Sequence, residues 1–148
     1  MFLLFLTSEE KSMSDLRINR FPNVSLVLRV TLLLVGVHSV ILGSTIYFFT
    51  VPFYQFFFSV NPDNFFFIKQ AGIFLFLMGF FYLLPVLDMN RFRAAIILVV
   101  FSKVIAVTFL LVNANLTPSP FMIYLAALGD ALMATTIIVL MVMKLKNP

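Results

Sequence analysis

Three ionisable residues stand inside long apolar stretches of this 148-residue chain: His38, Lys103 and Asp130. A charge near the centre of a membrane helix costs at least about 2.5–3.5 kcal/mol, so each needs a partner or a task. We expect Lys103 and Asp130 to form an ion pair, with His38 donating or accepting a hydrogen bond beside them. Such a trio can fix helix register, relay protons, or form a polar floor for a small ligand.

Two further basic residues lie closer to the ends of apolar stretches. Arg29 stands near the start of the first stretch and Lys69 near the start of the second. Their long stems allow the charge to reach the headgroup region while the methylene carbons stay in the apolar layer. We therefore treat both as secondary polar positions with a structural role.

The sequence excludes several other kinds of chemistry. With no cysteine and one histidine, the chain lacks the ligands of thiolate zinc sites, iron–sulfur clusters and bis-histidine haem. It contains no glycine-rich phosphate loop and no GxSxG nucleophile motif. We therefore predict no metal site, no cofactor and no catalytic residue. The formal charge of +4 is too scattered for a nucleic-acid surface, so nucleic acid is not an expected partner.

Four apolar stretches must position these residues. Hydrophobic residues make up 62% of the chain and charged residues only 11%, whereas soluble domains carry about a quarter charged residues. A membrane-spanning helix needs about 20 apolar residues. We therefore predict an all-α integral membrane four-helix bundle within residues 24–143. The predicted spans cover residues 24–49, 65–86, 94–112 and 121–143.

The basic residues predict the orientation, because Lys and Arg concentrate in cytoplasmic loops. We expect residues 1–23 and the tail, 144–148, to be cytoplasmic and the bundle to lie in a bacterial inner membrane. Seven basic residues fall in these two segments or in the turn between the second and third spans: Lys11, Arg17, Arg20, Arg91, Arg93, Lys144 and Lys146. The other two loops contain none. Residues 1–12 have no assigned role, and either Met1 or Met13 is the natural start.

The loop predicted over residues 50–64 is dense in aromatic side chains. Aromatic rings are favoured at the membrane–water interface, so this loop is interpreted either as an interfacial anchor or as a lid over a cavity that opens outward. The residues concerned are Phe53, Tyr54, Phe56, Phe57 and Phe58.

Small residues recur at helical spacing and predict close packing of the spans. Gly36 and Gly43 are seven residues apart in the first span, and Gly72 and Gly79 share a face of the second. In the fourth span Asp130 lies on a stripe of small residues, together with Ala126 and Ala134. We interpret the glycines as packing notches rather than ligand contacts.

The polar positions also follow a family pattern. Arg29 in LVLRVTLLLVG, Lys69 in IKQAGIFLFLMGFFYL, Lys103 in FSKVIAVTFLL and Asp130 in TPSPFMIYLAALGDALMA occur in order. This pattern resembles the DoxX-like group of small four-span bacterial membrane proteins. The resemblance implies that Lys69, Lys103 and Asp130 are the polar positions of interest, although Lys stands where Arg is expected and Asp where Glu is commoner. Most members of this group have no established biochemical role, and some accompany quinone-linked or redox systems as membrane subunits, so the resemblance implies the fold more than the function.

Three functions remain open. The first is a non-enzymatic bundle in the lipid bilayer, serving as a membrane subunit or binding a lipophilic small molecule, alone, as a homo-oligomer or in a larger complex. The second is an enzyme or redox partner acting on a quinone-like or lipid substrate, with His38, Lys103 and Asp130 as acid–base residues. The third is a small oligomeric transporter. A cavity reaching the three residues favours the second or third, and a dry Lys103–Asp130 contact favours the first.

Overall fold

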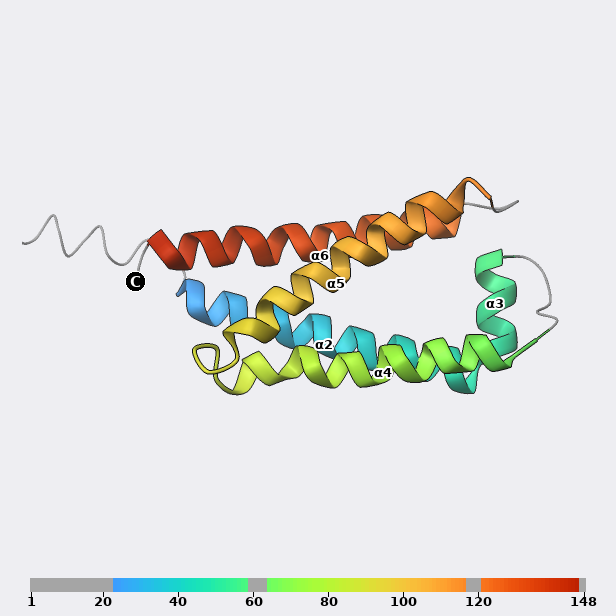
Figure 1. The fold of residues 1–148 in the computed structure, drawn as a ribbon, viewed down its shortest axis with the longest axis horizontal. Coiled ribbons are helices and arrows are strands. Elements are labelled where there is room, and N and C mark those ends of the chain that lie inside the picture. The colour runs from blue at the N-terminus through green and yellow to red at the C-terminus, as the bar shows by residue number, and fades with distance from the viewer. Residues whose placement is uncertain (1–22, 59–63, 117–120, 147–148) are drawn as a thin grey trace, which may run out of the picture.

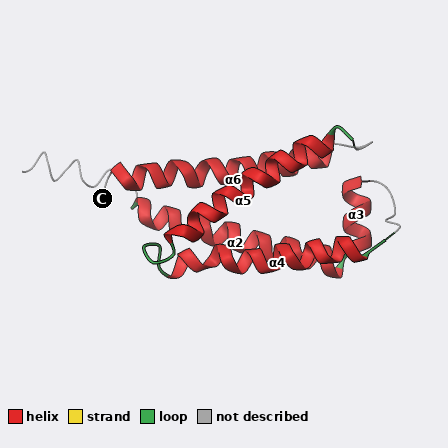
Figure 2. Cartoon of the chain, viewed as in Figure 1, coloured by secondary structure: helices red, strands yellow, loops and turns green. Residues whose placement is uncertain are grey.

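Long helices dominate the computed structural model, which describes residues 23–58, 64–116 and 121–146 (Figures 1 and 2). Four are long and apolar enough to cross a membrane: α2 (Val24–Phe48), α4 (Phe66–Leu87), α5 (Arg93–Ala114) and α6 (Phe121–Lys146). Their ends lie within three residues of the predicted spans. The predicted all-α membrane fold is therefore confirmed, and the chain is an integral membrane protein.

The two predicted cytoplasmic segments are only partly described. Residues 1–22, with Lys11, Arg17 and Arg20, lie outside the described part of the chain. At the other end α6 runs to Lys146, so most of the predicted tail continues the last helix. The side of the membrane on which these segments lie stays a prediction.

The long helices form two antiparallel pairs, α2 with α4 and α5 with α6 (Figure 1). Between the pairs, α6 also packs on α2, whereas α4 and α5 make less extensive contact. The pairs lie close together at the end that carries the α4–α5 turn. They diverge toward the opposite end, where α3 (Thr50–Phe58) stands crosswise between them (Figure 1).

Glycines allow the first pair to approach closely. A Cβ carbon added to Gly72 would lie 3.0 Å from the carbonyl oxygen of Gly43, and one added to Gly79 would lie 3.0 Å from that of Gly36. Side chains at these positions would separate the helices, since most of the atoms that they would meet belong to the backbone of α2. The predicted packing notches are confirmed for all four glycines.

The buried core occupies the half of the bundle nearest the α4–α5 turn. Side chains from all four long helices and from the turn itself contribute to it, and they fill the space where the two pairs converge. The residues are Leu28, Leu32, Val35, Tyr82, Met89, Ile96, Val99, Ile137 and Leu140. The other half of the bundle, toward α3, has no corresponding cluster among the described residues.

Helix α3 corrects the prediction of a loop over residues 50–64. Pro52 lacks an N–H, and in a continuous helix its ring would clash with the carbonyl group of Phe48. Helix α2 accordingly ends at Phe48, and Phe49 has non-helical dihedral angles (φ −116°, ψ 42°). The chain resumes as a helix at Thr50, where Pro52 falls in the first turn and its missing N–H costs nothing.

Candidate functional site

Lys103 and Asp130 meet between α5 and α6, at mid-length of both helices. The Lys103 Nζ atom donates a hydrogen bond to the Asp130 Oδ1 atom at 2.5 Å. The side chain of Lys103 is 7% exposed and that of Asp130 is 17% exposed. The predicted ion pair is therefore confirmed, and each charge is compensated where water is scarce.

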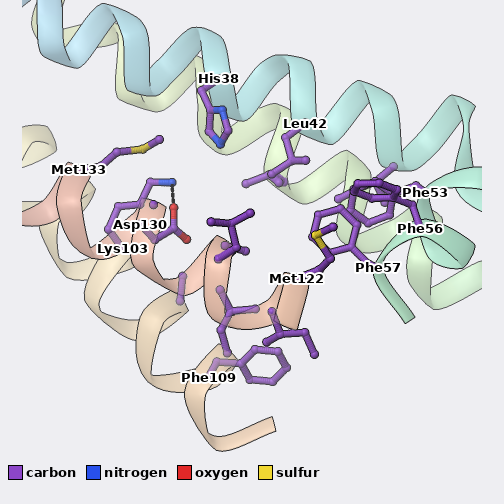
Figure 3. A pocket seen from close by; sticks show the side chains of 18 of the residues that line it. His38, Leu42, Phe53, Phe56, Phe57, Lys103, Phe109, Met122, Asp130 and Met133 are labelled. Carbon is purple, nitrogen blue, oxygen red and sulfur yellow. Dashed lines mark hydrogen bonds and ion pairs between the residues drawn. The ribbon is translucent and has the colours of Figure 1, made fainter. Parts of the chain in front are cut away.

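His38 approaches this pair from α2 but does not bond to it. Its imidazole points from α2 into the space in front of Lys103 and Asp130, and only the latter two are joined by the contact drawn there (Figure 3). Its side chain is exposed because that space is open. The prediction of a hydrogen bond between His38 and this pair is therefore wrong. Helix α2 packs most closely on α4, and the ring lies across the space from the pair, at the same end of the cavity.

A cavity of about 600 Å³ lies in front of these three side chains, in the half of the bundle that lacks the buried core. All five described helices contribute to its lining, and it runs between the two helix pairs. Among the described residues, the only polar ones in its lining are His38, Lys103 and Asp130. This volume falls within the range of small-molecule sites in proteins, which are apolar with a few convergent polar groups.

Aromatic side chains line the end of the cavity opposite the three polar residues. Phe53, Phe56 and Phe57 project from α3, and Met122 of α6 lies beside them (Figure 3). The rings of Phe53 and Phe57 stack with their centroids 4.5 Å apart. Helix α3 thus walls this end of the cavity, as the lid interpretation requires.

The two secondary polar positions lie outside this site. Arg29 and Lys69 are both exposed, and neither lines the cavity. The Nζ atom of Lys69 lies 5.8 Å from the centroid of the Tyr47 ring, at the end of the bundle near α3. Both positions are compatible with the structural role expected of them.

The small-residue stripe on α6 is rotated slightly from its predicted position. Ala127 and Ala134 are buried, whereas Ala126 is only partly buried and lines the cavity. Gly129 also lines the cavity, and a Cβ carbon there would meet no atom within 4 Å. Asp130 therefore lies at the boundary between the packed face of α6 and the cavity.

One polar contact was missed by sequence reasoning. The Tyr82 Oη atom of α4 and the Ser102 Oγ atom of α5 are 2.6 Å apart, and Tyr82 is 4% exposed. Ser102 donates its proton to the Val99 carbonyl group, so the Tyr82 hydroxyl is the donor to Ser102. Ser102 directly precedes Lys103, and hydroxyl groups in apolar helices are the signal that should have indicated it.

The site combines the two features that separated the candidate functions. The ion pair is a direct contact, as in a packed bundle, yet a cavity also reaches it, as an enzyme or transporter requires. Neutral imidazole can donate and accept, ammonium can donate, and carboxylate can accept hydrogen bonds. The described residues include no group of three or more metal-ligating side chains.

Comparisons of the chain with protein-family models, with curated proteins and with solved structures give no match.

Proposed function

We propose that this membrane protein binds a lipophilic molecule in the cavity between its two helix pairs. The polar group of the molecule lies at His38, Lys103 and Asp130, and its apolar part extends toward α3. The observation that carries this proposal is an apolar cavity of about 600 Å³ whose described lining contains these three polar residues and no others. Sites of this construction orient a ligand through few polar contacts and gain affinity from apolar burial.

Packing energetics support an occupied cavity. Protein interiors are close-packed, and empty apolar volume in a core is destabilising. The residues around this cavity are large enough to fill space, yet the helix pairs diverge around them. A molecule that partitions into the bilayer provides the missing contacts.

The membrane and the orientation of the bundle within it are part of the same proposal. The α4–α5 turn, with Arg91 and Arg93, and the end of α6, with Lys144, lie at one end of the bundle (Figure 1). We assign that end to the cytoplasm, in a bacterial inner membrane, because basic residues concentrate there. The cavity then lies in the outer half of the membrane. Membership of the DoxX-like group and assembly as a homo-oligomer or membrane subunit belong to this proposal too.

The test is to purify the protein from its membrane and identify bound lipophiles by extraction and mass spectrometry. Gly129→Leu places a larger side chain in the cavity at a position where a Cβ carbon meets nothing within 4 Å. The matched control is Leu128→Phe, which enlarges a neighbouring side chain of α6 that is 56% exposed and lies outside the cavity lining.

We expect one lipophile to accompany the wild-type protein and the Leu128→Phe variant. In the Gly129→Leu variant its amount falls by roughly tenfold, which corresponds to about 1.4 kcal/mol of binding free energy. Equal amounts in all three proteins contradict the proposal, since they indicate annular lipid rather than a cavity ligand.

A further inference from the structure

We propose that the ligand is an uncharged lipophile that carries one hydrogen-bonding group, a hydroxyl or a carbonyl, at one end. This inference rests on the proposed function of the cavity and specifies the chemical class of its ligand. It follows from the charge balance of the lining, from its free hydrogen-bonding capacity and from the separation of polar and aromatic walls.

The charge balance of the described cavity lining is neutral. Lys103 and Asp130 are the only charged residues among the described ones that line it, and they neutralise each other across a 2.5 Å contact. A ligand with a charged headgroup would therefore bring an unbalanced charge into an apolar site. Such a charge finds a counter-ion only by displacing one member of the pair, which leaves the other member uncompensated.

Hydrogen-bonding capacity nevertheless remains at this end of the cavity. The Lys103 ammonium has three donors and gives one to the Asp130 Oδ1 atom. The imidazole of His38 faces the same space without bonding to either residue, and it both donates and accepts. A hydroxyl group can satisfy donors and acceptors here, and a carbonyl group can accept from Lys103 or His38.

The polarity of the cavity has a direction, which sets the form of the ligand. His38, Lys103 and Asp130 lie at one end, and Phe53, Phe56 and Phe57 lie at the other (Figure 3). A molecule with polar groups at both ends would place one of them against aromatic rings, where the described lining offers it no polar partner. The lining therefore suits a single polar end and a long apolar body.

The experiment uses the full chain in lipid nanodiscs, labelled with a 1-hexadecanol probe that carries a diazirine on its chain. Unlabelled competitors are added at equal mole fractions: 1-hexadecanol, hexadecyl methyl sulfone, hexadecanesulfonate and hexadecyltrimethylammonium. The sulfone is the neutral, similarly sized control for the sulfonate, and the two ions keep their charge at every pH used. Photolabelled peptides are quantified by mass spectrometry, and Gly129→Leu measures labelling outside the cavity.

We expect the alcohol and the sulfone to suppress labelling at mole fractions at least about tenfold lower than those needed for either ion, a difference of about 1.4 kcal/mol. Labelling that does not depend on Gly129, or that no competitor suppresses, contradicts lipophile binding itself. Suppression by the sulfonate or the ammonium ion as effective as that by the alcohol leaves lipophile binding intact and overturns the uncharged class.

Charge-changing variants provide an independent test of the charge-balance argument. Asp130→Asn leaves Lys103 without its counter-charge, so hexadecanesulfonate should gain at least about tenfold as a competitor. Lys103→Met leaves Asp130 uncompensated, so hexadecyltrimethylammonium should gain instead. Unchanged competitor ranking in a folded Asp130→Asn variant overturns the charge-balance argument. If neither variant folds, the wild-type competition decides alone.

Discussion

The ammonium of Lys103 and the carboxylate of Asp130 each give up hydration at mid-helix and regain a polar partner from the neighbouring helix. Their 2.5 Å contact is the compensation, and both side chains are largely buried. Removing one partner therefore costs more than removing both, because a single substitution leaves an uncompensated charge. His38 belongs to a different class of residue, since it faces the cavity and not a protein partner.

Replacing Lys103 with methionine should lower the free energy of unfolding by about 3–5 kcal/mol, because Asp130 then remains buried without a counter-charge. The double variant Lys103→Met/Asp130→Leu should recover much of that loss. Thermal unfolding in detergent measures both effects. The control is Lys69→Met, an exposed lysine of a membrane helix, which should change stability by less than about 1 kcal/mol. Equal melting temperatures of Lys103→Met and Lys69→Met would contradict the stabilising role of the buried ion pair.

Replacing His38 with alanine should leave the unfolding free energy within about 0.5 kcal/mol of wild type, as expected for an exposed residue outside bonded networks. The amount of copurified lipophile should nevertheless fall, because the substitution removes one of three polar groups at the cavity wall. Parallel melting and extraction separate the two effects. Destabilisation comparable to that of Lys103→Met indicates instead that the imidazole supports the fold.

At the scale of elements, different contacts hold the two helix pairs. Helices α2 and α4 meet backbone to backbone through four glycines, whereas α5 and α6 are joined by the ion pair. Between α4 and α5 the described residues add a hydrogen bond from Tyr82 to Ser102 to the apolar contacts of the core. The first pair is therefore the more sensitive to added volume and the second the more sensitive to lost charge.

The substitution Gly43→Ala should lower the free energy of unfolding by about 1–3 kcal/mol, since its Cβ carbon would run into the backbone of Phe76 and push α4 away. Gly129→Ala is the matched control, because its Cβ carbon meets no atom within 4 Å. Alanine is also the better helix former, so this control should be neutral or more stable by up to about 1 kcal/mol. Thermal unfolding of both variants in detergent measures the difference. Similar losses of stability in both would contradict the interpretation of Gly43 as a packing notch.

The α4–α5 turn should contribute a pH-dependent stability. Backbone N–H groups of Arg91 and Asn90 donate to the Asp88 carboxylate, at 3.0 and 2.9 Å, and lower the pKa of Asp88 below its ordinary value. The stabilisation is therefore complete above the ordinary carboxyl pKa and is lost as pH falls through the lowered value. Asp88→Asn should lose less melting temperature than wild type between pH 5 and pH 2. Identical pH dependences of the melting temperature in Asp88→Asn and wild type would contradict a contribution of this turn to the pH-dependent stability.

At the scale of the whole molecule, one half of the bundle is packed and the other half is hollow. The buried core lies toward the α4–α5 turn, and the cavity lies toward α3. The packed core and the cavity are thereby separated along the length of the bundle, with Lys103 and Asp130 at the boundary.

Hydropathy and helix-breaking residues predict the long helices well. The length of a span is set by the bilayer thickness, so a local stretch of apolar residues is enough to identify it. Helix α3 could not be predicted in the same way, since the break at Phe49 and the helical restart depend on how the chain turns around Pro52. The Lys103–Asp130 pair follows from depth alone. The position of His38 does not follow from depth. It depends on which helix packs most closely against α2, and a shared depth in the membrane does not determine that.

Orientation decides from which side the cavity is reached, and the cysteine-free chain allows a clean test. Leu116→Cys lies beyond the end of α5 nearest the cavity, at a residue that is 79% exposed, and Asn90→Cys lies in the exposed turn at the packed end. Because Arg91 and Arg93 should keep that turn cytoplasmic, a membrane-impermeant maleimide should label Leu116→Cys in intact bacterial spheroplasts. It should label Asn90→Cys only after permeabilisation. The reverse pattern places the cavity in the cytoplasmic half of the membrane, and its ligand would then come from the inner leaflet.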